Sequence, residues 1–256
     1  RRQRQMCIRD RMIAGAVTDN ERVAYIADYP IYGMIANINA FALGVASVNP
    51  RAKVYLAWSK TKDYDRNKFL TENDLHYVSD QDIITPNDAS RYFGLYKLQD
   101  GQALNLAMPI WNWGVFYEKL LQSVLAGSYK AEGQEQVKAL NYWWGMSAGV
   151  IDLICSKHVP YGVKRLADHL KSDITKGEVV PFFGQIYDQK GELKNKGEHE
   201  MKPSDIMKMD WLVDNVVGSI PPMSEFVDNA KMVVELKGVE AVSYTHLRAH
   251  ETLSDL

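Results

Sequence analysis

The chain has 256 residues, a formal net charge of -2 and 24% charged residues, a composition typical of a globular protein. No polybasic field is available for nucleic acid, so we expect no nucleic-acid partner. No apolar run approaches the roughly 20 residues of a membrane-spanning helix.

The two ends differ in composition from the body. Residues 6–11 (MCIRDR) resemble the translation of a transposase adapter used to prepare sequencing libraries, and residues 242–252 (VSYTHLRAHET) resemble its reverse complement. We therefore expect residues 1–11 and 242–256 to be adapter-derived tails, and residues 12–241 to be a fragment of a larger protein. Without those tails the body has 24 basic and 29 acidic residues, which makes it mildly acidic.

Residues 23–58 (VAYIADYPIYGMIANINAFALGVASVNPRAKVYLAW) predict a strand, a loop, a helix and a second strand. The apolar run 23–27 is typical of a strand buried on both faces. From residue 32 to residue 48, apolar and small residues recur at three- and four-residue steps, which predicts a helix that packs on a sheet. A crossover this short between strands predicts a parallel, right-handed unit whose first loop faces a crevice.

The rest of the chain predicts further strands and helices. Residues 12–16 predict the end of a helix. Strands are expected at 75–79 and 94–98, with a tight turn at Asp100-Gly101 and another apolar run at 104–108. The predicted helices and the predicted hairpin, in chain order, are a helix at 86–92, a helix at 111–126, a helix at 160–176, a hairpin of 184–187 with 192–194, a helix at 203–217 and a helix at 224–236.

Signatures of nucleotide, zinc-protease and serine-hydrolase sites are absent from the sequence, so we expect no cofactor and no metal. The histidines at 76, 158, 169 and 199 stand at spacings that do not suit zinc. Cys155 is the only cysteine of the body and is expected to be a small core residue.

Aromatic and carboxylate residues follow the predicted strands, where an open α/β sheet binds its ligand. Aromatic rings can stack on a flat ligand, and carboxylates accept hydrogen bonds from hydroxyl groups. We expect a neutral, polyhydroxylated small molecule as the ligand. The candidate ligand-binding residues are Asp28, Tyr29, Trp58, Asp80, Gln81, Asp82, Lys97, Trp111 and Trp113.

Structural roles compete with the ligand-binding role at several of these positions. Trp58 closes a strand and is equally well interpreted as a core residue. Asp82 precedes a turn that it could brace. Of the adjacent Trp143 and Trp144, at most one is expected to face a cleft. At Asp28 and Gln81 a functional role is favoured, because loops after parallel strands carry the sites of such sheets.

Residues 23–58 also carry a family likeness. Phe41, Gly44, Val48, Asn49 and Pro50 form the pattern F-x-x-G-x-x-x-V-N-P. This stretch resembles the second half of the BMP (basic membrane protein) family of ABC-transporter substrate-binding lipoproteins, the purine nucleoside receptor A-like group. The likeness extends from about residue 12 to residue 239 and includes SDQDIITP, NYWWGMSAGVIDLICS and MDWLVDNVVGSIP.

The resemblance implies an α/β fold of the type I periplasmic-binding-protein kind, with a doubly wound parallel sheet. The fragment would contain mainly the second lobe of a two-lobed fold that closes on its ligand by a hinge motion. The resemblance also implies an extracytoplasmic receptor that is held to the cell membrane by a lipid anchor missing from this fragment. Its partner would be an ABC permease. The chain departs from the family where nucleoside-binding members have an aspartate and this chain has Lys97, and where they have a lysine and it has residues 110–113.

We therefore expect a non-enzymatic solute-binding protein of an ABC importer with a nucleoside-like ligand. A sugar is the alternative ligand. Two other functions stay open: an α/β enzyme with a carboxylate site at Asp28, Asp80 and Asp82, and a sensory module that uses the same cleft.

Overall fold

The computed structural model describes residues 12–31, 33–80, 92–127, 148–176, 178 and 182–238. Residues 12–17 are helical. The elements that follow, in chain order, are β1 (Arg22–Ala27), α2 (Met34–Val48), β2 (Lys53–Trp58), α3 (Arg66–Glu72), β3 (Tyr77–Ser79), β4 (Leu95–Gln99), β5 (Gln102–Trp111), α4 (Trp113–Leu125), β6 (Ile151–Cys155), α5 (Tyr161–Lys176), β7 (Gln185–Tyr187), β8 (Leu193–Lys196), α6 (Pro203–Met207), β9 (Val216–Val217), η2 (Met223–Glu225) and α7 (Asp228–Lys237).

The described residues form one seven-stranded sheet in the order β6-β5-β4-β3-β1-β2-β9, and a separate hairpin of β7 and β8. β1 lies parallel to both β2 and β3, and β2 lies parallel to β9. The predicted α/β class and the parallel unit of residues 23–58 are confirmed. β4, β5 and β6 instead pair antiparallel with their neighbours, so the sheet is mixed.

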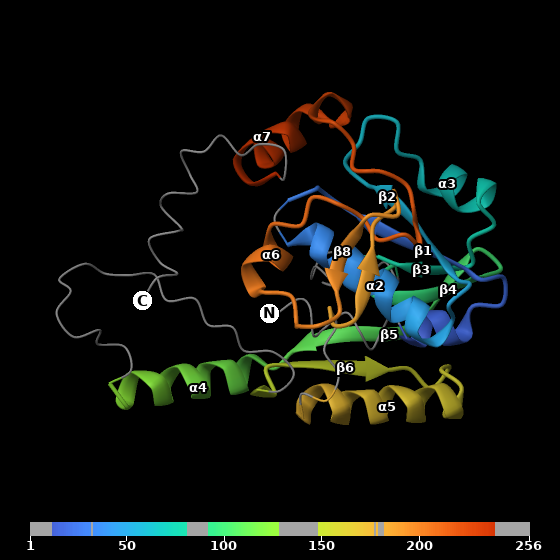
Figure 1. Ribbon diagram of the computed structural model, residues 1–256. Helices are drawn as coiled ribbons and strands as arrows, with labels where there is room; N and C mark the ends of the chain where they lie inside the picture. The colour runs from blue at the N-terminus through green and yellow to red at the C-terminus, as the bar shows by residue number, and fades with distance from the viewer. Residues whose placement is uncertain are drawn as a thin grey trace.

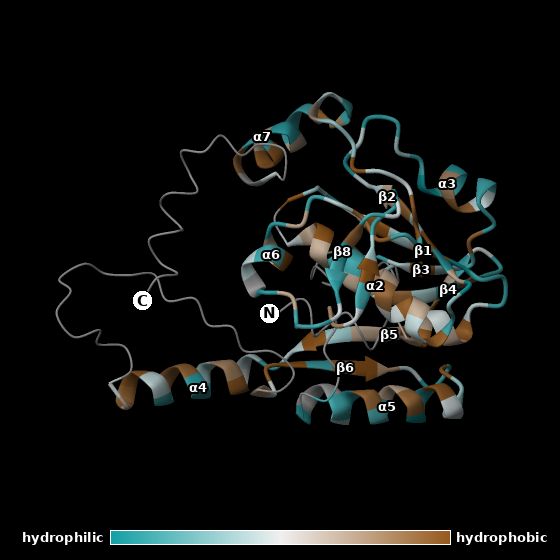
Figure 2. Ribbon diagram, in the orientation of Figure 1, coloured by the Kyte–Doolittle hydropathy of each residue, from teal (hydrophilic) through white to brown (hydrophobic). Residues whose placement is uncertain are grey.

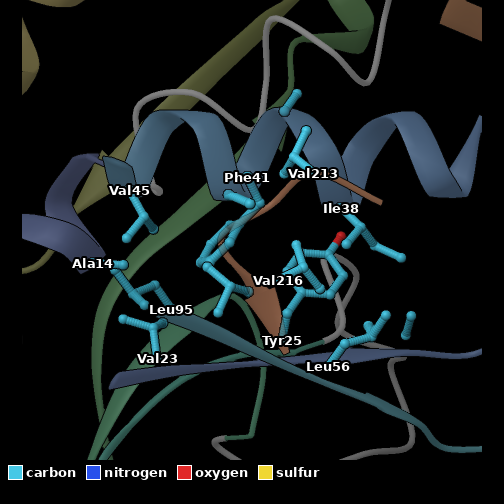
Figure 3. Packing of buried hydrophobic residues seen from close by; sticks show 14 of the residues in the cluster. Ala14, Val23, Tyr25, Ile38, Phe41, Val45, Leu56, Leu95, Val213 and Val216 are labelled. Carbon is cyan, nitrogen blue, oxygen red and sulfur yellow. The ribbon is translucent and has the colours of Figure 1, made fainter. Parts of the chain in front are cut away.

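Helix α2 supplies the centre of the core. Its side chains at Ile38, Phe41 and Val45 point toward the strands, where Figure 3 shows them facing Val23 and Tyr25. Phe41 meets the ring of Tyr25 edge to face at 5.0 Å between centroids. The three- and four-residue spacing that predicted the helix therefore places one stripe of it on the sheet.

Two helices near the chain middle lie at the margin of the sheet. Figure 1 shows α5 running alongside β6, and α4 extending away from the strands beyond the end of β5. In Figure 2 both helices alternate hydrophobic and hydrophilic residues. No residue of α4 is buried, and Tyr117 and Leu121 are more than half exposed. The predicted helices at 111–126 and 160–176 are confirmed.

The predicted turns are confirmed where glycine or aspartate allows a left-handed backbone. Asp100 and Gly101, between β4 and β5, have φ angles of 51° and 74°, as a two-residue hairpin turn requires. Gly191, in the turn between β7 and β8, has a φ angle of 78°. Of the predicted helix at 86–92, residues 86–91 lie outside the described residues.

The predicted helix at 203–217 is wrong beyond Met207. Its apolar residues do lie in the core, since Met209, Leu212 and Val213 are buried. These three residues lie in an irregular segment that leads into β9, and not in a helix. The amide group of Asn39 on α2 binds the backbone of this segment, donating to the carbonyl of Trp211 at 2.7 Å and accepting from the amide of Val213 at 3.0 Å. These two hydrogen bonds satisfy backbone groups that would bond to one another in a helix.

Candidate functional site

Asp28 and Ser59 lie side by side where β1 and β2 end. The two strands are in parallel register, with Ala27 opposite Trp58, so the residues that follow each strand are neighbours. The amide of Ser59 donates to the carbonyl of Ala27 at 2.7 Å, and its hydroxyl donates to Oδ1 of Asp28. The serine therefore fixes the orientation of the carboxylate and leaves oxygen lone pairs for other donors.

Asp80 follows β3 at the same edge of the sheet. Ser79 pairs with Tyr25, which sets Asp80 about 7 Å back along the strand direction from Asp28. The side chain of Asp80 is only 10% exposed. Asp28, Ser59 and Asp80 are thus brought together by three neighbouring parallel strands, as the sequence predicted for the two carboxylates.

A tyrosine and an arginine hold Asp80. The hydroxyl of Tyr96 on β4 donates to Oδ2 of Asp80 at 3.2 Å and accepts a hydrogen bond from Arg66 at the start of α3. The guanidinium of Arg66 lies 3.9 Å from the ring centroid of Tyr92. Nε of Arg66 is 3.8 Å from Oδ2 of Asp80, which adds an ion pair. Sequence reasoning did not select Tyr96 or Arg66.

Burial raises the pKa of Tyr96, and the Asp80 carboxylate raises it further, while the charge of Arg66 opposes the shift. The hydroxyl therefore stays protonated at neutral pH. It can serve as the link between a partly buried cation and a partly buried carboxylate.

Replacing Tyr96 with phenylalanine tests this link. We expect the free energy of unfolding at pH 7 to fall by about 1–3 kcal/mol, because Asp80 and Arg66 each lose a partner. Tyr96 and Tyr64 have pKa values raised above the unfolded value of about 10, so stability is complete below pH 10 and is lost as the pH rises toward about 12. Urea unfolding between pH 7 and pH 12 measures both effects.

Tyr96→Phe should lose less stability between pH 10 and pH 12 than the wild type, since one raised pKa is gone. Tyr117→Phe is the matched control, because Tyr117 is 56% exposed on α4. Equal stability of Tyr96→Phe and the control at pH 7 would rule out the link.

Tyr64 lies beside both carboxylates, in the connection between β2 and α3. Burial, followed by the Asp80 carboxylate, raises its pKa to about 12; Arg66 opposes the shift, and Asp28 adds to it. Tyr64 was not among the predicted site residues. Its signal was its place between the end of the second strand and Asp65, which caps α3 by accepting from the amide of Lys68 at 3.0 Å.

Tyr29 follows Asp28 but packs against the C-terminal segment. Its ring contacts a small core of Phe226, Ala230 and Val234. The same segment is bonded to the loop after β2, where the amide of Val227 donates to the carbonyl of Lys60 at 3.1 Å. The C-terminal segment thus braces the edge that carries Asp28.

Trp58 is buried at the end of β2 and is 6% exposed. Its indole N–H donates to the carbonyl of Ser219 at 2.9 Å. Both its ring and its polar atom are therefore used inside the protein, which fits the alternative of a core residue.

The structure does not bring Lys97 to this edge. Because β4 runs antiparallel to β3, Lys97 pairs with Tyr77 at the opposite end of the short strand. Its ammonium lies 3.8 Å from Asp19 and 5.1 Å from the Tyr77 ring centroid. The prediction grouped Lys97 with Asp28 and Asp80, because the direction of the strand that carries Lys97 cannot be read from the local sequence.

Trp111 and Trp113 stack on one another at the junction of β5 and α4, with ring centroids 5.7 Å apart and planes 19° apart. Trp113 is 52% exposed. β5 runs in the direction of β1 and carries Trp111 four residues past the level of Ser79, about 13 Å beyond the end of β3. Gln81 and Asp82 lie outside the described residues.

A groove of about 390 Å³ opens beside Tyr64, between α3 and the segment after β9. It is bordered by Trp58, Thr61, Asp63, Tyr64, Gly218 and Ser219, among others. Within the described ranges, no three histidine, cysteine or acidic residues are grouped so as to hold a metal ion. None of the described helices is both long and apolar enough to cross a membrane.

Two known proteins are similar in sequence to this chain. The chain is 26% identical over 223 residues to a purine-binding protein of Brucella abortus, covering 82% of this chain and 61% of that protein. It is 32% identical over 149 residues to a putative ABC transporter glucose-binding protein of Haloferax volcanii, covering 53% of this chain and 36% of that protein. Both relatives are named as solute-binding proteins. No family model matches the chain.

Two solved structures are similar to about two thirds of the chain. One is an ABC transporter solute-binding protein from Conexibacter woesei, with a TM-score of 0.48, 16% identity and coverage of 70% of this chain and 63% of that one. The other is a transcriptional activator of the comK gene from Bacillus halodurans, with a TM-score of 0.49, 14% identity and coverage of 70% and 64%. At those scores neither structure bears on function.

Proposed function

We propose that this chain is part of the solute-binding component of an ABC importer and binds a nucleoside-like molecule at the edge formed by Asp28, Ser59 and Asp80. The similarity to a purine-binding protein over 82% of the chain carries this proposal. The chain spans about three fifths of that relative's length. What is said of the activity and partners of the whole protein is therefore part of the proposal.

The edge offers what a neutral, hydroxylated ligand requires. The two carboxylates are held by Ser59 and Tyr96 and can accept hydrogen bonds from ligand hydroxyl groups. Among the described residues, Arg66 forms an ion pair with Asp80 at 3.8 Å. The two carboxylates at this edge favour an uncharged solute over a phosphorylated one, because their negative charges would repel a phosphate.

A sugar is the second candidate, favoured by the similarity to the glucose-binding protein. The remaining proposals follow from the BMP-family likeness: a two-lobed receptor that closes by a hinge, an extracytoplasmic location, a lipid anchor on the whole protein and an ABC permease as partner.

Isothermal titration with inosine, adenosine and glucose tests the proposal. We expect a nucleoside to bind with no chemical change on chromatography, and its 5′-monophosphate to bind at least about tenfold more weakly. Conversion of the ligand would support the alternative of a carboxylate enzyme. Binding with no permease or ATPase gene beside the complete gene would support the sensory module.

Asp28→Ala isolates the site. Loss of a hydrogen bond to a charged group costs about 1.5–3 kcal/mol, so we expect affinity to fall about tenfold to a hundredfold. Asp214→Ala is the control, because Asp214 is exposed in the loop before β9. Titration of the bound nucleoside measures both variants. Wild-type affinity in Asp28→Ala, or no binding of any of the three solutes by the wild type, would overturn the proposed function.

A further inference from the structure

The hydroxyl oxygen of Tyr64 is buried and has no hydrogen-bond partner among the residues that the structure describes. Its ring packs with Phe69 and Leu70 on the α3 face of the sheet, so the hydroxyl is held in a fixed place. A buried donor without a partner is destabilising, and folded proteins rarely keep one without a reason.

The surroundings of Tyr64 contain a second donor of the same kind. Nε of Arg66 is also buried and makes no hydrogen bond within the described part of the chain, although it lies 3.8 Å from Oδ2 of Asp80. Tyr64 also borders the groove of about 390 Å³ described above. Tyr64 therefore lies beside a groove and within electrostatic reach of the two carboxylates.

The protonation state of Tyr64 fits a donor. Burial raises its pKa to about 12, and the carboxylates of Asp80 and Asp28 act in the same direction. The group is then a neutral O–H at every physiological pH. The same carboxylates disfavour an anionic acceptor at this place, which leaves a neutral carbonyl oxygen, ether oxygen or ring nitrogen.

We propose that Tyr64 is a specificity-determining residue of the solute site, whose hydroxyl donates to a neutral acceptor of the solute. This inference rests on the proposed function. A solute without that acceptor leaves the buried donor unpaired and is rejected for that reason. Asp28 and Asp80 then select the hydroxyl groups of the solute, while Tyr64 selects its acceptor.

Tyr64→Phe separates this role from a structural one, because the two roles predict opposite results. We expect the urea midpoint of the ligand-free protein to stay constant or rise, since removing an unpaired buried hydroxyl removes its cost. We expect nucleoside affinity to fall about tenfold in titration, which is the loss of one hydrogen bond. Tyr55→Phe is the control, because Tyr55 packs on the same face of the sheet and should keep both values.

Each result decides one question. A lower urea midpoint for Tyr64→Phe would show that the hydroxyl has a partner inside the protein, and would overturn the inference whether or not a solute binds. Wild-type affinity in Tyr64→Phe, together with nucleoside binding by the wild type, would also overturn it while leaving the proposed function intact. A wild type that binds none of the solutes rejects the proposed function itself, and with it the role of Tyr64.

Discussion

Phe41→Ala is expected to lower the free energy of unfolding by about 3–5 kcal/mol, the cost of removing a buried phenylalanine side chain. Phe41 is 1% exposed at the centre of α2 and meets the ring of Tyr25. The substitution loses the transfer free energy of the ring and leaves a cavity between the helix and the strands (Figure 3). A domain is stable by only about 5–15 kcal/mol, so this loss is a large fraction of the total.

Urea unfolding followed by circular dichroism measures the loss, with an unchanged m-value as evidence that the folded and unfolded states keep their compactness. Phe183→Ala is the matched control, because Phe183 is 59% exposed and its loss should change stability by less than about 0.5 kcal/mol. A Phe41→Ala variant as stable as the control would show that α2 does not pack on the sheet as described.

Asn39→Ala is expected to lower the free energy of unfolding by about 2–5 kcal/mol, because the buried amide of Val213 and the partly buried carbonyl of Trp211 lose their partner. Asn39 is fully buried on α2 and bonds the carbonyl of Trp211 and the amide of Val213. Alanine is the better helix former by about 0.5 kcal/mol, which offsets only a small part of the loss. The segment that leads into β9 would then be held less firmly on the helix.

The prediction has a second readout besides urea unfolding. Hydrogen exchange at the amide of Val213 should speed up in Asn39→Ala more than exchange within β1, because the bond lost is local to that segment. Asn67→Ala on α3 is the control, since Asn67 is exposed. Unchanged exchange at Val213 would show that Asn39 does not hold this segment.

Local sequence patterns were sufficient to predict an element whose structure depends mainly on its own residues. The strand, helix and strand of residues 23–58 were predicted correctly, because the apolar spacing of α2 and the continuous apolar runs of β1 and β2 each fit one structure. The helix predicted at 203–217 failed beyond Met207. Met209, Leu212 and Val213 are spaced like helical core residues, but Asn39 from a distant helix takes the backbone bonds that a helix would need.

Some residues of the candidate site could be predicted from the sequence, and others could not. The sequence placed Asp28 and Asp80 at one edge, because residues that follow parallel strands share an edge. It could not place Lys97, because the direction of β4 depends on pairing with β3 rather than on any local signal. Tyr96 and Arg66 were missed because their roles exist only where β4 and α3 meet Asp80.

The sequence by itself determined the α/β class, the central parallel unit and the edge where two carboxylates gather, because these follow from periodicity and from the geometry of parallel strands. Only the tertiary structure decided which side chains hold those carboxylates, which strands run antiparallel, and that Trp58 uses its indole N–H inside the protein. It also decided that the Tyr64 hydroxyl is buried without a partner among the described residues. These features depend on contacts between residues far apart in the chain, and such contacts cannot be predicted from local propensity.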